Sequence, residues 1–188
     1  MKKYILYGIL FLFLGSFASA QTKGIGIRFG YNFANLSGDI QENETLTAFH
    51  VGAFTDFKLN ERLFLQPELM FSVQGSGFSY GEEDSVSDTD LKLSYLNIPV
   101  LLSYHYNENL SFTAGPQIGV LMGAKDAGKD IINNVESYDM AFSLGLAYKV
   151  YKDIRISARY NQGFVKVTSE EGRDWRHNVF QLSMAFIL

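Results

Sequence analysis

The chain has 188 residues, with 20 acidic side chains, 16 basic side chains and no cysteine. That length suits one domain. The lack of cysteine excludes disulfides, thiolate metal sites and cysteine nucleophiles. The net charge of −4 argues against nucleic acid as a partner, because nucleic-acid binding needs a basic surface.

Residues 1–20 have the composition of a secretory signal peptide. The segment begins with lysines at positions 2 and 3, continues with the apolar run 4–14 and ends with small residues at 18–20. A membrane-spanning helix is the alternative, but it needs about 20 apolar residues, and this run has 11. We expect cleavage after Ala20, which leaves a mature chain of 21–188 with a net charge of −6.

From residue 24 onward, apolar side chains recur with a period of two. In 24–35, for example, Ile25, Ile27 and Phe29 alternate with Gly26 and Arg28. Such alternation predicts amphipathic β-strands. Eight are predicted, over 24–35, 48–58, 63–74, 94–106, 110–122, 138–150, 154–165 and 180–188.

The segments between these strands alternate in length. Long polar segments lie at 36–46, 75–91, 123–136 and 167–176. Tight turns lie at 59–61, 106–109 and 151–153. Short turns at one end and long loops at the other are typical of outer-membrane barrels.

The alternation does not by itself say which solvent the apolar face meets. A soluble, lipocalin-like barrel would point that face inward around a ligand. Strand length, inward faces rich in small residues and long charged groups, and aromatics near strand ends favour a membrane barrel with lipid outside. These aromatics are Tyr104, Tyr106, Tyr148 and Tyr151 at the short-turn end, and Phe33, Phe71 and Tyr138 at the other. We therefore predict an all-β, eight-stranded, antiparallel, up-and-down transmembrane β-barrel.

Three segments resemble the outer-membrane β-barrel family of Bacteroidota, often labelled "porin family" or PorT-like. They are "YLNIPVLLSYHY", "TAGPQIGVLMG" and "RISARYNQGFVKV". The matching positions are Tyr95, Ile98, Pro99 and Leu102, then Gly115 and Pro116, then Arg159, Tyr160 and Gly163. The resemblance implies an eight-stranded barrel in the outer membrane of a Gram-negative bacterium, and it implies no shared biochemical activity.

An eight-stranded barrel encloses space for side chains and little else. The inward faces carry a predicted polar network of Arg28, Asp56, Lys58, Glu68, Lys149, Arg155 and Arg159. We expect Glu68 to pair with Arg28 or Arg159, because an unpaired charge in a narrow lumen is costly. The network either fills and rigidifies the lumen or lines a narrow ion path.

Nothing in the sequence indicates an enzyme, a cofactor or a metal site. His50 and His177 are expected near the loop-side rim, and His105 completes the histidines. No metal-ligand spacing and no nucleophile elbow surrounds them.

Two long segments carry charged candidates for ion or surface contact. The acidic segment 75–91 contains Glu82, Glu83, Asp84, Asp88 and Asp90 and no basic residue. It suits a cation or a basic partner, or it is simply a solvated loop. The last loop carries Arg173, Trp175 and Arg176, where arginine can meet lipopolysaccharide phosphates and tryptophan the membrane interface.

Pro99 lies inside the predicted strand 94–106 and cannot donate to a β-ladder. We predict a bulge or a skipped hydrogen bond there.

The preferred function is structural or interaction-based: a surface barrel that presents loops and contacts outer-membrane lipid, lipopolysaccharide and an unidentified envelope protein. The alternatives are a narrow channel or accessory of envelope transport and secretion, and a soluble lipocalin-like carrier.

Overall fold

The structure is a computed structural model that describes residues 22–38, 43–80, 87–126, 128–132, 135–167 and 175–188. The predicted signal peptide, residues 1–20, lies outside these ranges. Within them, no helix is long and apolar enough to cross a membrane.

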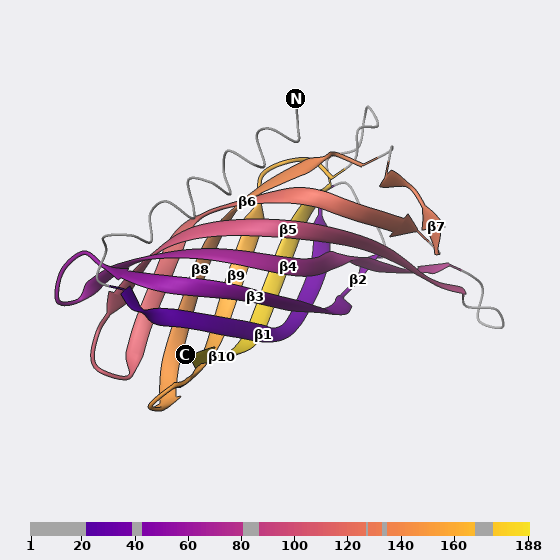
Figure 1. The fold of residues 1–188 in the computed structure, drawn as a ribbon. Coiled ribbons are helices and arrows are strands. Elements are labelled where there is room, and N and C mark those ends of the chain that lie inside the picture. Colours follow the sequence, from indigo (N-terminus) through magenta and orange to yellow (C-terminus); the bar gives the residue numbers. More distant parts are fainter. Residues whose placement is uncertain (1–21, 39–42, 81–86, 127, 133–134, 168–174) are drawn as a thin grey trace.

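Eight long antiparallel strands close into a barrel (Figure 1). They are β1 (Thr22–Ser37), β3 (Leu46–Lys58), β4 (Leu63–Tyr80), β5 (Ser87–His105), β6 (Leu110–Asp126), β8 (Tyr138–Tyr151), β9 (Ile154–Gly163) and β10 (Arg176–Ile187). The first and last strands close the ladder, with Gly26 opposite Ile187 at one end and Ser37 opposite Arg176 at the other. The predicted fold class is confirmed.

Polar side chains point into the barrel and apolar side chains point out. The buried polar and charged side chains include Arg28, Asn32, His50, Asp56, Gln66, Glu68, Ser72, Asn97, Gln117, Asp139, Arg159 and Gln181. The exposed apolar ones include Ile27, Phe29, Val51, Leu102, Phe112, Ile118, Leu144, Leu182 and Met184. This orientation of the side chains is opposite to that of a lipocalin-like carrier. It gives the barrel the continuous apolar outer wall that a membrane barrel presents to lipid.

The predicted aromatic groups lie mainly on the outer wall. Tyr104, Tyr106, Tyr148, Tyr151 and Tyr138 are all exposed. The two phenylalanines named with them are half-buried, and each contacts another outward ring. Phe33 lies 6.3 Å from Phe180, and Phe71 lies 6.0 Å from Phe49, between ring centroids.

Asparagine side chains close two of the short turns, which define the short-turn end of the barrel. Asn60 Oδ1 accepts hydrogen bonds from the backbone N–H groups of Arg62 and Leu63, at 3.0 and 2.9 Å. Asn107 Oδ1 likewise accepts hydrogen bonds from the backbone N–H groups of Asn109 and Leu110, at 2.9 and 2.7 Å. An Asx turn of this kind fixes a tight connection between antiparallel strands.

The strands at the opposite, loop end are longer than the sequence predicted. The segment 75–91 was expected to be a loop, but β4 continues to Tyr80 and β5 already begins at Ser87. Two-residue strands add to this end: β2 (Asn43–Glu44) pairs with β4, and β7 (Lys129–Asp130) pairs with β6. Glycine, serine and aspartate dominate 75–91, so the hairpin continues by backbone pairing without an apolar alternation to reveal it.

All three prolines lie in the barrel wall, and each interrupts a different ladder. Pairing is skipped beside Pro67 between β3 and β4, beside Pro99 between β4 and β5, and beside Pro116 between β5 and β6. The register is the same on both sides of each gap. The skipped pairing predicted at Pro99 is present, but the bulge is not. The register shift of the β5–β6 ladder lies instead between Ser94 and Tyr95, where Met122 is an extra residue on β6.

The outward orientation of Leu144, at the middle of β8, gives a first prediction. Leu144 is 55% exposed on the apolar wall, so Leu144→Arg should lower the free energy of unfolding in lipid vesicles by about 2–4 kcal/mol. Tyr151→Arg, at the end of the same strand, is the control and should cost at most about 1 kcal/mol. Equal costs, measured by reversible urea unfolding, would contradict the placement of Leu144 at mid-membrane.

Candidate functional site

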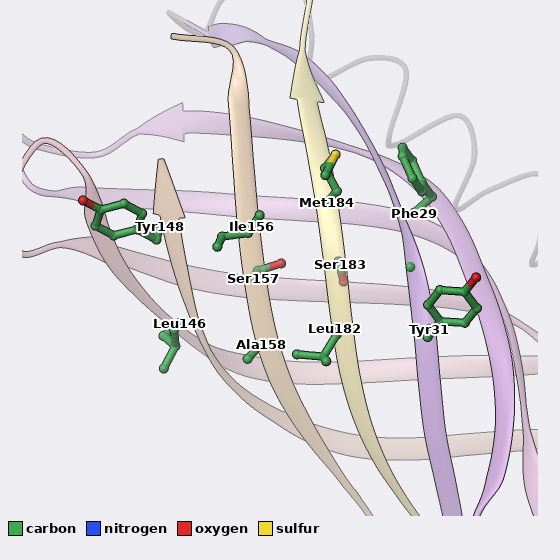
Figure 2. A pocket seen from close by; sticks show the side chains of 11 residues that line it. Phe29, Tyr31, Leu146, Tyr148, Ile156, Ser157, Ala158, Leu182, Ser183 and Met184 are labelled. Atoms are coloured by element: carbon green, nitrogen blue, oxygen red, sulfur yellow. The ribbon is translucent and has the colours of Figure 1, made fainter. Parts of the chain in front are cut away.

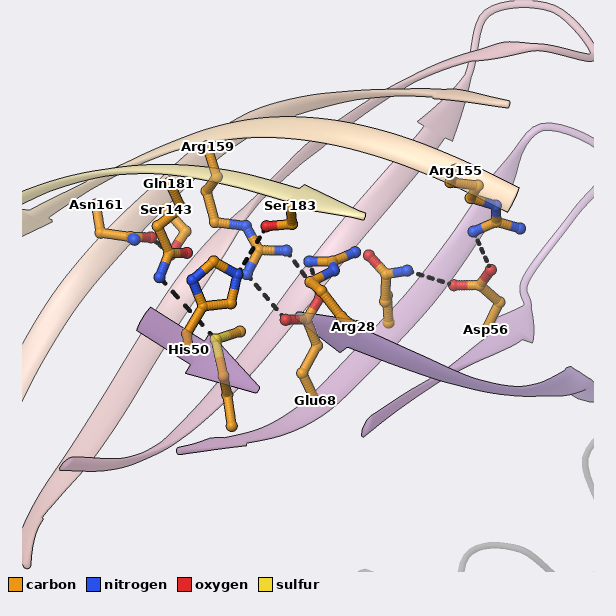
Figure 3. A network of polar contacts seen from close by, with 12 residues as sticks. Arg28, His50, Asp56, Glu68, Ser143, Arg155, Arg159, Asn161, Gln181 and Ser183 are labelled. Atoms are coloured by element: carbon orange, nitrogen blue, oxygen red, sulfur yellow. Dashed lines mark hydrogen bonds and ion pairs between the residues drawn. The ribbon is translucent and has the colours of Figure 1, made fainter. Parts of the chain in front are cut away.

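A carboxylate lies between two guanidinium groups inside the barrel (Figure 3). Arg28 on β1 donates from Nη1 to Glu68 Oε1 on β4 at 2.9 Å. Arg159 on β9 donates from Nη1 to Oε2 and from Nη2 to Oε1, both at 2.8 Å. All three side chains are at most 5% exposed. The sequence predicted that Glu68 pairs with one of these arginines, and it pairs with both.

Small neighbours leave room for the two arginines. Across the ladders, Arg28 lies between Gly52 on β3 and Ala185 on β10. Arg159 lies opposite Gly145 on β8. Small residues at these inward positions let the long side chains turn toward the barrel axis and meet Glu68.

A second ion pair lies nearer the short-turn end. Arg155 Nη1 donates to Asp56 Oδ2 at 2.8 Å, and Gln66 Nε2 donates to Asp56 Oδ1 at 2.8 Å. The Arg28 guanidinium also lies 4.9 Å from the centre of the Phe54 ring. The two ion-paired clusters therefore fill successive parts of the lumen.

Two of the predicted network members lie apart from these clusters. Lys58 is the last residue of β3 and is exposed, and Lys149 near the end of β8 is half-buried. Among the described residues, neither forms an ion pair. A lysine at a strand end can extend its flexible stem toward water, which is the physical reason for this departure from the sequence prediction.

His50 lies inside the barrel, whereas the sequence placed it at the rim. Its Nδ1 is 2.7 Å from Asn32 Oδ1, and its Nε2 is 2.8 Å from Ser183 Oγ. Asn32 also accepts from Gln181 Nε2 at 2.9 Å and donates to Ser72 Oγ at 2.9 Å. Sequence reasoning missed this network, although each of these side chains lies on a predicted inward face.

An apolar cluster lies at the loop end of the lumen and was not predicted. It contains Leu36, Leu91, Leu93, Tyr95, Ala124, Val135 and Val167. Trp175, which the sequence assigned to the surface, packs against this cluster. His177 is also buried, contrary to its expected rim position, and its Nε2 lies 3.4 Å from Tyr95 Oη.

The three histidines lie apart from one another in the barrel. The His105 ring packs against Phe64 near the short-turn end, with ring centroids 4.4 Å apart and a tilt of 30° between the rings. His50 and His177 each lie in separate networks. In the part of the chain that the structure describes, no group of three or more His, Cys, Asp or Glu side chains is placed to hold a metal ion.

The charged loop candidates are only partly described. Asp90 pairs with Lys92 at 2.8 Å, with side chains 42% and 52% exposed. Asp88 lies in β5, and only its backbone is described. Arg176 is exposed at the start of β10. Glu82, Glu83, Asp84 and Arg173 lie outside the described residues.

The residues that carried the family resemblance shape the wall. Leu102 and Tyr160 point outward, Ile98 is half-buried and Pro99 is buried. A Cβ on Gly115, next to Pro116, would collide with the Val100 carbonyl. At Gly163 a Cβ would lie 2.8 Å from the His177 carbonyl oxygen. These two glycines allow neighbouring strands to approach closely.

A shallow apolar groove of about 450 Å³ lies on the outer wall (Figure 2). Four small residues, Gly30, Ser157, Ala158 and Ser183, and seven larger ones line it. The larger residues are Phe29, Tyr31, Leu146, Tyr148, Ile156, Leu182 and Met184. The groove belongs to the lipid-facing surface and is separate from the polar lumen.

Comparison with solved structures shows the same fold in other proteins. Ail, the attachment invasion locus protein of Yersinia pestis, is 14% identical, with 88% of this chain and 99% of that chain covered and a TM-score of 0.54. Ail in complex with the heparin analogue sucrose octasulfate is 19% identical over the same shares, with a TM-score of 0.55. Neisserial surface protein A is 14% identical, with 89% and 99% covered and a TM-score of 0.57.

No curated protein sequence matches this chain. A family model described as "Outer membrane protein beta-barrel domain" matches residues 19–169, which include seven of the eight long strands. The closed barrel with its apolar outer wall agrees with that match. The chain therefore belongs to the outer membrane protein β-barrel domain family.

Proposed function

We propose that this protein is a filled barrel whose activity lies on its loops and outer surface, with no open path through its lumen. The observation that carries the proposal is the contact of Glu68 with Arg28 and Arg159, which joins β4 to β1 and β9 across the interior. The Asp56–Arg155 pair fills a further part of the lumen. Two buried ion-paired clusters in series oppose a continuous column of water.

The charge of the long segments supports an interaction role for the loop end. The segments 36–46, 75–91, 123–136 and 167–176 hold 14 of the 20 acidic residues and four of the 16 basic ones. In the outer membrane this end faces outward. Such a surface attracts cations and basic partners and repels polyanions. The sulfated sugar bound in the Ail complex is therefore a poor guide to the ligand of this chain.

Lipopolysaccharide is also anionic, so we infer that divalent cations bridge its phosphates to this acidic end. A basic segment of an envelope protein is the alternative partner with suitable charge.

A narrow channel or transport accessory is the second candidate function. The observation that favours it is the run of charged side chains along the lumen from Arg155 to Arg159. Ion conduction would require the ion pairs in this run to open.

The cellular setting is part of the proposal. Residues 1–20 act as a cleaved leader that directs the chain to the outer membrane of a Gram-negative bacterium. The motif residues Tyr95, Pro99 and Gly115 support a PorT-like relationship within Bacteroidota. Mass spectrometry of the purified protein should find Gln21 as the first residue.

Conductance measurements separate the filled barrel from the channel. In planar bilayers the wild-type protein should give no steady current. The triple variant Arg28→Ala, Glu68→Ala, Arg159→Ala removes the central cluster and should give measurable current. A steady current through the wild-type barrel would refute the filled-lumen proposal and support the channel.

The stability of the central cluster can be tested separately. Glu68→Gln leaves two buried guanidinium groups without their counter-charge and should lower the free energy of unfolding by about 3–5 kcal/mol. Asp90→Asn breaks an exposed ion pair and should change it by less than about 1 kcal/mol. Urea titration in lipid vesicles measures the free energy of unfolding of both variants. An effect of Glu68→Gln as small as that of Asp90→Asn would contradict the stabilising role of Glu68.

Binding to lipopolysaccharide can be followed through Trp175, the only tryptophan of the chain. Its fluorescence should respond to lipopolysaccharide added to the barrel in phosphatidylcholine nanodiscs when Mg²⁺ is present. Chelation of Mg²⁺ should weaken the apparent affinity at least about tenfold, a change of about 1.4 kcal/mol. Binding that does not depend on Mg²⁺ would contradict the bridging role of divalent cations.

A further inference from the structure

Asp139 on β8 is a buried carboxylate without a basic partner. Its side chain points into the barrel and the residue is 3% exposed. Among the described residues, no Lys, Arg or His forms an ion pair with it.

The other buried carboxylates of the lumen are balanced. Glu68 has two guanidinium groups and Asp56 has one. An ionised carboxylate removed from water is costly unless a positive charge compensates it. Asp139 is therefore the exception among the described carboxylates of the lumen, and no described side chain supplies its counter-charge.

Gly119 on β6 lets the Asn97 amide lie close to the backbone beside Asp139. The ladders place Gly119 between Asn97 on β5 and Asp139 on β8. A Cβ on Gly119 would lie 2.5 Å from Asn97 Oδ1, 3.4 Å from Tyr95 Cδ1 and 3.5 Å from Asp139 Cβ. The missing side chain thus brings the Asn97 amide and the Asp139 side chain to the same point of the lumen.

Two buried amides, one at this point and one diagonally beside it, have polar atoms to which no described residue hydrogen-bonds. Asn97 is 1% exposed, and neither its Oδ1 nor its Nδ2 has a partner. Gln117 is 3% exposed, and its Oε1 has none. On β6, Gln117 faces the same side as Gly119 and is a diagonal neighbour of Asn97 and Asp139 across the two ladders. Buried polar atoms are ordinarily hydrogen-bonded, so these atoms point to a bound species.

We propose that Asp139, Asn97 and Gln117 hold a small monovalent cation such as Na⁺ or K⁺. One carboxylate and two amide oxygens form a hard, oxygen-only donor set with a single negative charge, which a singly charged ion neutralises. Mg²⁺ and Ca²⁺ usually need more carboxylates or retained waters, and would leave excess positive charge in this buried site. Water alone satisfies the amides but leaves the Asp139 charge uncompensated.

Two measurements on the wild-type barrel test the site. The midpoint of thermal unfolding in detergent should rise with the concentration of NaCl or KCl. At equal ionic strength it should be higher in these salts than in choline chloride, because a ligand that binds the folded state stabilises it. Crystals grown with thallium(I) should show anomalous density between Asp139 and Asn97. The thallium measurement needs no variant, so it stands even where a substitution prevents folding.

Three variants sharpen the test. Asp139→Asn removes the charge and should abolish the difference between alkali and choline salts. Gly119→Ala keeps the carboxylate, but its Cβ would displace Asn97 Oδ1, and it should weaken the apparent cation affinity by at least about tenfold, or about 1.4 kcal/mol. Asp153→Asn changes an exposed acid at a short turn and should leave the cation effect intact.

Equal unfolding midpoints in alkali and choline salts, or an absence of thallium at the site, would overturn the proposal. A cation effect that persists in Asp139→Asn would also overturn it. Crystal density for water alone between Asn97 and Gln117 would show that the amides are hydrated and that Asp139 is neutralised by a proton. The site does not depend on the proposed surface function, so either proposal can fail alone.

Discussion

The contact of Glu68 with two arginines from other strands sets the register of much of this barrel. Side chains alternate between lumen and lipid, so a slip of one residue in β1, β4 or β9 would turn a charged group toward hydrocarbon. The apolar outer wall enforces the same register from the other side, because its large side chains would then be forced into a narrow lumen. Charge inside and hydrocarbon outside therefore select one pairing of strands.

The space for these charges is made by small residues. Gly52 and Ala185 flank Arg28, and a Cβ on Gly26 would collide with the Phe54 ring, which instead lies over the bare backbone. Phe54 in turn lies beneath the Arg28 guanidinium. Around Arg28 and Phe54, the lumen is thus packed by placing a large side chain beside a position without one, and this explains the glycines at 26 and 52.

The sequence predicted the fold well because its main signal is local. A period of two over strands that cross lipid leaves little choice of architecture, and the inward charges at Arg28, Glu68 and Arg159 follow from the same alternation. The predictions failed where that signal ends. β4 extends to Tyr80 and β5 begins at Ser87 without apolar alternation, so the sequence predicts a loop for these parts of the strands. It also predicts a rim position for His177, which is buried in the barrel.

Other features of the site depend on contacts that no single strand reveals. Lys58 and Arg155 both occupy inward positions near the short turns, yet only Arg155 meets a carboxylate, because Asp56 lies across from it in the closed barrel. Trp175 joins the apolar cluster because strands distant in sequence converge at the loop end. Such partners are fixed by closure and strand tilt, which alternation alone does not specify.

These contacts divide the lumen into zones that differ in the polarity of their side chains. Toward the short turns, carboxylates and guanidinium groups balance one another, and at the loop end an apolar cluster excludes water. Asp139 and Asn97 lie where these zones meet: Asn97 is two residues from Tyr95 of the apolar cluster and pairs with Met70, two residues from Glu68. An arginine at position 119, across the ladder from Asp139, would be the simplest counter-charge for that carboxylate, but position 119 is a glycine. A Cβ at Gly119 would displace the Asn97 amide, so the glycine keeps beside Asp139 an amide to which no described residue hydrogen-bonds, and this pair of polar groups argues for an occupant between them.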